Sequence, residues 1–445
     1  MTGAEDSSEP KRGLTGRPGF AAFQHTDYTF YFISRVSSVF GVDLMSATLF
    51  WQLWRITQEE LVYAALGVGM FLPFLILFPL SGWTADHYPR TKILLGTVSL
   101  QGLCAAGFLY LTWMDAPFLW FIPSIALMGV ARAFQQPAQQ AIVPVLVPAG
   151  HLANAIAWQS TASQGARVLG WGISGTIIAI GEASGVNEQF AYIVVVAVLV
   201  FSAFFTFLIK ARAQIMAKEP LNFSTVAAGL RFVFSRKIIL GAIGLDLVAV
   251  LLGSAKAMMP IYATKVLQIE TALYGLLQGS LVMGSLIFML GLTQFPIRRH
   301  AGRKLFLAVG AFGLFTVVFG LSTVFWISLV ALFFVGAGDS ISIFIRNNLV
   351  QIITPDEMRG RVNAVNSVFI GASNELGDAE SGAVAHLFGP VAAVVIGGVG
   401  TIVATIAFAT KIPDLWNVDS LDPDDLVRKY RDVDPAATPA TQAGA

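Results

Sequence analysis

The 445-residue sequence contains a single cysteine, Cys104, and only 12% of its residues are charged. One cysteine excludes a disulfide within the chain, and its place in an apolar run is typical of a small buried side chain. The five histidines lie far apart, without the spacing of metal ligands. No Walker or dinucleotide-binding motif occurs, which excludes direct use of ATP, and no nucleophile–base set indicates an enzyme. We therefore expect no metal, no cofactor and no nucleic-acid partner.

Apolar residues dominate instead, because 55% of the chain is hydrophobic and the mean hydropathy is +0.69. A helix needs roughly 20 apolar residues to cross the hydrocarbon layer of a bilayer. The sequence predicts an all-α integral membrane protein with twelve such helices, approximately at 28–54, 61–83, 92–113, 118–145, 152–180, 190–210, 237–262, 271–295, 304–322, 325–350, 362–387 and 390–411.

The basic residues predict the orientation of these helices. Of the 28 Lys and Arg residues, 21 fall in both tails and in every second loop, and the opposite loops hold only Arg55 and Lys265. Positively charged loops stay in the cytoplasm, so both termini are expected there. The first 26 residues contain no apolar core of a signal peptide. The two tails are rich in Gly, Pro, Ser and Asp, which predicts disorder.

An internal repeat divides the chain. Segments 148–175 and 355–382 align without a gap at an offset of 207 residues. The matched positions include Pro148/Pro355, Gly170/Gly377 and Gly175/Gly382, and Gly129/Gly336 extends the match upstream. Two pseudo-symmetric halves of six helices are a transporter architecture, with the substrate site between them. The predicted domains are a tail (1–26), a first bundle (27–212), a linker with an amphipathic helix (213–235), a second bundle (236–412) and a tail (413–445).

The loop GWTADHYPRTK at 82–92 carries the first family signal. It resembles the signature loop between helices 2 and 3 of the major facilitator superfamily, and FPIRRHAGRK at 295–304 is a degenerate second copy. The resemblance implies a latch between the halves, with Asp86 and Arg90 forming ion pairs at helix ends and Gly82 allowing close helix approach. The alternative is a loop that only follows the positive-inside rule.

Three further segments narrow the resemblance to one branch. RAFQQPAQQAIVPVLVP at 132–148, HLANAIAWQ at 151–159 and RNNLVQIITPDEMRGRVNAVNSVFIGASNELGDAESG at 346–382 are similar to the enterobactin-exporter-like branch, also called transmembrane secretion effectors. This resemblance implies the major facilitator fold and export of siderophore-like or drug-like molecules from a bacterial inner membrane.

Charged and polar residues inside the apolar runs are the candidate functional residues, since such groups are costly in lipid and usually line a cavity or pair with each other. For proton coupling or the substrate cavity, we expect Arg35, Asp43, Arg132, Gln136, Arg167, Asp246, Asp339, Asn374, Glu375 and Asp378. The spacings of three, four and seven residues predict one polar stripe along the fourth helix, formed by Arg132, Gln135, Gln136 and Gln139. On the eleventh helix, Asn374, Glu375 and Asp378 are predicted to share one face. Asp43, Glu375 and Asp378 are the first candidates for the proton carrier. The alternative for each residue is a static ion pair, which we favour for Arg346 and Glu380.

The sequence thus predicts a monomeric secondary transporter that exports a small amphiphilic molecule in exchange for protons by alternating access. An importer or uniporter of a small metabolite, and a non-transporting membrane receptor, are the alternatives. A receptor would not require charge on so many helices at membrane depth.

Overall fold

This computed structural model describes residues 18–210, 223–297 and 299–431. Within these residues all regular secondary structure is helical, and no strand occurs. The first bundle contains η2 (Pro18–Gln24), α1 (Thr26–Thr57), α2 (Leu61–His87), α3 (Arg90–Trp113), η3 (Phe118–Phe121), α4 (Ile122–Leu146), α5 (Ala149–Gly172), α6 (Ser174–Ala183) and α7 (Gln189–Phe207).

The second bundle begins with a short helix, α8 (Phe223–Ser235), which packs on α14. Its other elements are α9 (Lys237–Gly253), α10 (Met259–Ile261), the π-helical turn η4 (Tyr262–Val266), α11 (Thr271–Gln294), α12 (Ala301–Leu321), α13 (Phe325–Ile353), α14 (Asp356–Phe388), α15 (Pro390–Lys411), α16 (Pro413–Trp416), α17 (Pro423–Leu426) and η5 (Val427–Arg431). The first part of the predicted linker, at 213–222, lies outside the described residues.

Nine helices of the described chain are long and apolar enough to cross a membrane. They coincide with nine of the twelve predicted runs. The three other runs contain α5 with α6, α9 with α10, and α14. The first two runs are interrupted, at Ile173 and between Gly253 and Met259, and α14 carries three acidic residues within its predicted span. The count of twelve spans itself stays a prediction.

The matched segments of the repeat form equivalent structures in the two bundles. Helices α5 and α14 each begin directly after a matched proline, Pro148 and Pro355, which has the extended backbone of an N-cap. On α4, Gly129 lies against a backbone carbonyl of α2, and Gly336 on α13 lies against a backbone carbonyl of α11. A Cβ at either glycine would collide with that carbonyl, so both glycines allow the same close helix contact, once in each bundle.

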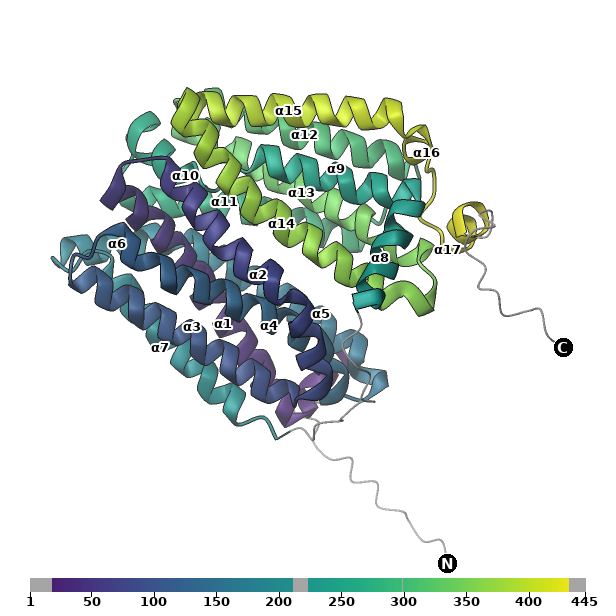
Figure 1. Ribbon diagram of the computed structural model, residues 1–445, viewed down its shortest axis with the longest axis horizontal. Coiled ribbons are helices and arrows are strands. Elements are labelled where there is room, and N and C mark those ends of the chain that lie inside the picture. Colours follow the sequence, from purple (N-terminus) through teal and green to yellow (C-terminus); the bar gives the residue numbers. More distant parts are fainter. Residues whose placement is uncertain (1–17, 211–222, 298, 432–445) are drawn as a thin grey trace, which may run out of the picture.

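The bundles lie against each other at one end of the molecule. Figure 1 shows them in contact near α6 and α10 and diverging toward the end near α8 and α17. We call the joined end the closed face. Two seams, α2 against α14 and α5–α6 against α11, hold it together. The structure therefore shows a conformation that is closed on the side opposite α8 and α17.

Both tails are more ordered than the sequence predicts. Residues 18–24 form a 3-10 helix whose phenylalanines contact Trp158 on α5. Residues 413–431 are partly helical, with Leu415 and Leu426 buried, and the Val418 carbonyl accepts a hydrogen bond of 2.8 Å from the Gly302 N–H. The prediction of disorder is wrong for these residues, because aromatic and aliphatic side chains spaced among the polar ones dock them. Residues 1–17 and 432–445 lie outside the described part.

Candidate functional site

Glycines in the repeat allow the closest approach of the two bundles at the closed face. Gly175 at the start of α6 lies against the backbone of Thr271 and Gly275 on α11. The matched Gly382 on α14 lies against the Glu60 carbonyl and the first turn of α2. The same repeat position therefore lies in both seams. A larger side chain at either glycine would clash with the backbone of the opposite bundle.

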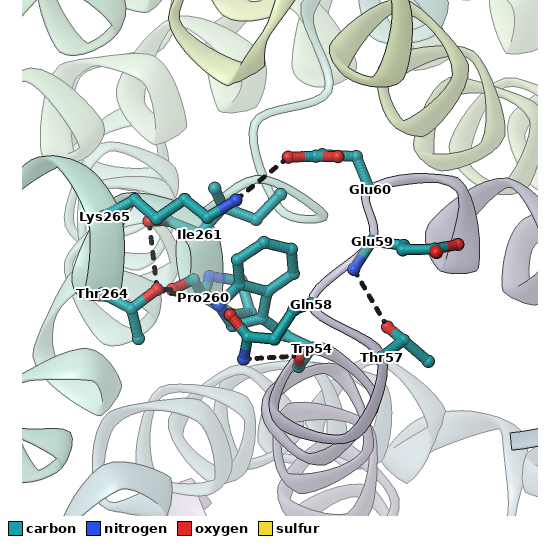
Figure 2. Close-up of polar contacts among 9 residues, drawn as sticks. All are labelled: Trp54, Thr57, Gln58, Glu59, Glu60, Pro260, Ile261, Thr264 and Lys265. Atoms are coloured by element: carbon teal, nitrogen blue, oxygen red, sulfur yellow. Dashed lines mark hydrogen bonds and ion pairs between the residues drawn. The ribbon is translucent and has the colours of Figure 1, made fainter. Parts of the chain in front are cut away.

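Polar side chains also join the two bundles beside these seams, in the region that Figure 2 shows. The indole N–H of Trp54, in the last turn of α1, donates a hydrogen bond of 2.8 Å to Thr264 Oγ in the π-helical turn. The Lys265 ammonium lies 4.5 Å from the centre of the Trp54 ring and 3.4 Å from a Glu60 carboxylate oxygen. These contacts join the α1–α2 connection of the first bundle to the interrupted helix of the second bundle.

Replacing either seam glycine by leucine is expected to open the closed face. Overpacking typically costs about 1–3 kcal/mol, so in Gly175→Leu or Gly382→Leu the open population should rise by about 5- to 150-fold. The measurement is maleimide labelling of Ala47→Cys in a Cys104→Ser background, because Ala47 is fully buried in the closed conformation. Gly96→Leu is the control, since nothing lies within 4 Å of that position. Unchanged labelling in both seam variants would contradict the packing role.

An ion pair crosses between the bundles at the middle of the molecule. Arg132 on α4 pairs with Glu375 on α14. The Glu375 side chain is buried, whereas 42% of the Arg132 side chain is exposed. Arg132 thus contacts the other bundle while much of its side chain stays accessible. The structure therefore brings together two of the predicted site residues from different halves.

The predicted polar stripe on α4 does not face this space as a whole. Gln135 is buried inside the first bundle, where it exchanges hydrogen bonds of 3.0 and 3.3 Å with Gln101 on α3. Gln136, one residue further along, is half-buried. The prediction of a single stripe is wrong for Gln135, because spacings of three and four residues place side chains on opposite sides of Arg132 around the helix, and one of those sides faces α3.

Asp43 on α1 lies in a strongly cationic environment. The charges of Arg167, Lys256, Arg35 and Arg132 all act on its carboxyl group. Its Oδ2 atom is buried and has no hydrogen-bond partner among the described residues. Helix α5 approaches α1 closely here, because a Cβ at Gly170 would lie 3.1 Å from the Asp43 Cβ. The predicted residues Arg35, Asp43 and Arg167 are thus brought together in the first bundle.

A partly open cavity lies in the second bundle, lined by residues of α9, α11, α12, α13 and α14 and of the segment between α9 and α10. Three predicted residues line it: Asp246, Asp339 and Asn374. Asp246 is already paired, at 2.5 Å, with the fully buried Arg346, and Ser342 donates a long hydrogen bond of 3.4 Å to it. Apolar side chains supply most of the remaining wall.

Neighbouring acids on α14 have different partners. Glu375 pairs with the first bundle, whereas Asp378 accepts a hydrogen bond of 2.6 Å from the Ser254 hydroxyl, in the second bundle. Asn374 donates to the Ile370 carbonyl of its own helix, at 2.8 Å. The predicted shared face of these residues is therefore divided between the two halves of the molecule.

The predicted latch at 82–92 is described in part. The Arg90 guanidinium donates a hydrogen bond of 3.0 Å to the Ala141 carbonyl, near the end of α4. At Gly82 nothing lies within 4 Å of the place that a Cβ would take, so this glycine makes no close helix contact in this conformation. The side chain of Asp86 lies outside what the structure describes. Its role in a latch stays a prediction.

Lys256 is the residue that the predicted site set omitted, although it lines the same cavity as Asp246 and Asp339. Its sequence neighbours, Ser-Ala-Lys-Ala-Met, are small or apolar and continue the run 237–262. The available signal was the positive charge in the middle of that run, because such a charge in lipid normally marks a cavity or a partner.

Comparisons with known proteins agree with this geometry. The family model described as transmembrane secretion effector matches residues 17–433. The protein named enterobactin exporter EntS in Citrobacter koseri is 24% identical over 406 residues, which cover 88% of this chain and 93% of that protein. EntS of Escherichia coli O139:H28 is 24% identical over 399 residues, with 87% and 88% covered.

Solved structures of transporters share the fold. A mutant of the nucleoside transporter NupG superposes with a TM-score of 0.70 at 11% identity, covering 86% of this chain and 99% of that one. A bacterial homologue of the lysosomal transporter Spinster, inward-facing and occupied, gives 0.64 at 13% identity, with 90% and 97% covered. Because the family model spans nearly the whole chain, this protein belongs to the transmembrane secretion effector family of the major facilitator transporters.

Proposed function

We propose that this multi-pass membrane transporter exports an amphiphilic small molecule, of the siderophore or drug type, in exchange for protons. The Arg132–Glu375 pair carries the proposal, because it joins the two bundles where a transporter of this fold holds its substrate. A carboxylate there has to exchange its arginine for a proton or a substrate group when the bundles move apart. The EntS relatives, whose name states export of enterobactin, support the direction and the substrate class.

The proposed setting is the cytoplasmic membrane of a bacterium with both termini in the cytoplasm, as the distribution of Lys and Arg indicates. The described conformation would then be open to the cytoplasm and closed on the outside. Asp43 and Asp378, together with Glu375, are the proposed proton carriers. Asp86, Arg90 and Gly82 are the proposed latch of the opposite conformation, in which the end near the termini closes.

Transport by the purified protein in liposomes tests this proposal. Enterobactin and a lipophilic dye should each accumulate inside liposomes that carry the protein with its cytoplasmic side outward, and only when a proton gradient is imposed. Collapse of the gradient with an ionophore should release them. Empty liposomes are the control for passive entry. Entry that needs no proton gradient and stops when the substrate concentrations on the two sides are equal would identify a uniporter. Gradient-driven movement in the opposite direction would identify an importer. Binding without any flux would indicate a receptor.

A further inference from the structure

The helix that should cross the membrane at 237–262 is interrupted beside the cavity. Helix α9 ends at Gly253, the backbone of Ser254 is extended, and helical structure resumes at Met259. Such a break at membrane depth is tolerated only where other groups bind the freed backbone or where it lines a cavity. Here the Ser381 hydroxyl donates to the Ser254 carbonyl at 2.9 Å, and the Gln278 amide donates to the Lys256 carbonyl at 3.4 Å.

Lys256 lies in the middle of this interrupted segment and lines the cavity. Among the residues that the structure describes, its ammonium group makes no hydrogen bond and no ion pair. Arg346, the other cation in the cavity wall, forms an ion pair with Asp246 at 2.5 Å. Lys256 is therefore the cation of this cavity that has no bonded partner in the described chain.

The charge of Lys256 is felt by acids of both bundles, none of which pairs with it among the described residues. Its charge acts on Asp378 on α14, on Asp339 on α13 and on Asp43 on α1. Asp378 is already bonded to the Ser254 hydroxyl at 2.6 Å. The ammonium group is thus within the electrostatic reach of three carboxyl groups, and its hydrogen-bond donors are free for a ligand among the described residues.

We propose that Lys256 binds an anionic group of the transported molecule, a carboxylate or another acidic oxygen group, while the apolar wall of the cavity holds the rest of that molecule. This inference rests on the proposed transport function and adds the charge of the substrate to it. Charge-assisted hydrogen bonds in a cavity of low polarity are the stronger class, so a bound anion gains most by meeting an uncommitted ammonium. Phe312, Leu281 and Val335 supply apolar surface on the same wall.

Equilibrium binding to the full-length protein in detergent tests the proposal. The probes are a dansyl-labelled long-chain carboxylate and its uncharged methyl ester, which differ only in charge. The wild type should prefer the carboxylate. Lys256→Gln should weaken carboxylate binding by about 10- to 100-fold, the loss expected for one charged hydrogen bond, and should leave ester binding unchanged. Lys256→Arg should restore most of the preference.

Unchanged ester binding by Lys256→Gln shows that the cavity is intact, which separates a binding role from a structural one. Equal affinity of the wild type for both probes, or a carboxylate preference that survives in Lys256→Gln, would overturn the proposal. In the second case Arg35, Arg132 or Arg167 would be the anion-binding residue instead. The assay needs no transport, so wild-type protein that binds the carboxylate but moves nothing across liposomes would contradict the proposed function and leave this inference standing.

Discussion

Arg132→Ala is expected to reduce transport by at least about 100-fold. The substitution leaves the buried Glu375 carboxylate without its partner, and a buried charge without a partner is costly, although the 42% exposure of the Arg132 side chain lowers the energy of the pair itself. Glu375→Gln removes the charge instead, so it should keep the fold and equilibrium exchange while abolishing accumulation against a gradient. Initial rates and steady-state accumulation in proteoliposomes measure both effects, with the amount of folded protein checked by gel filtration.

The matched control for this prediction is Glu60→Gln, an acid-to-amide change in the other ion pair between the bundles. The Glu60 side chain is 16% exposed and that of its partner Lys265 is 48% exposed, so both members of this pair reach solvent, whereas Glu375 is buried. Exposed pairs contribute only about 0–1 kcal/mol. Transport should therefore stay within about fivefold of the wild type. The charge-exchanged variant with Arg132→Glu and Glu375→Arg should recover part of the lost transport. Wild-type accumulation in both Arg132→Ala and Glu375→Gln would remove this pair from the mechanism.

Arg346→Met is expected to destabilise the protein by about 3–5 kcal/mol, because it leaves Asp246 unpaired where both side chains are almost fully buried. The double variant with Asp246→Leu should regain most of that stability, since an apolar pair of similar volume needs no desolvation of charge. Unfolding in detergent, followed by circular dichroism against temperature, compares the variants. Ser342→Ala is the control and should change little, because its hydrogen bond to Asp246 is long, at 3.4 Å.

This second prediction separates a static pair from a coupling residue. If the double variant is stable and still accumulates substrate against a gradient, Asp246 and Arg346 only hold α9 against α13. If it is stable but transports downhill only, Asp246 belongs to the proton pathway. A single Arg346→Met variant as stable as the wild type would show that Asp246 is already neutral or paired elsewhere.

Local sequence signals predicted the features that depend on nearby residues. The matched prolines at 148 and 355 were visible as repeat positions, and in the structure they directly precede α5 and α14, a few residues before the predicted runs at 152 and 362. The long apolar runs likewise predicted nine of the helices that can span a membrane. Matched glycines such as Gly175 and Gly382 were visible as a repeat. What they contact depends on which helices meet, and local sequence patterns do not reveal that.

The arrangement of the charges was the part that the sequence could not predict. Glu375 and Asp378 lie three residues apart on one helix, yet their partners belong to different bundles. Pairing of this kind is decided by the position of the helix between its neighbours. The interruption after Gly253 was missed for another reason: Ser254 to Met258 contain no proline or glycine, and the break is held by side chains from α11 and α14.

Trp54 gives the closed face an optical signal of its own. Its indole ring is 1% exposed, and its N–H group and one ring face are both occupied by residues of the opposite bundle. Separation of the bundles would bring water to the ring and remove the neighbouring ammonium, which shifts indole emission to longer wavelength. A protein that keeps Trp54 as its sole tryptophan would therefore report each opening of this face in real time, without a label and without a known substrate.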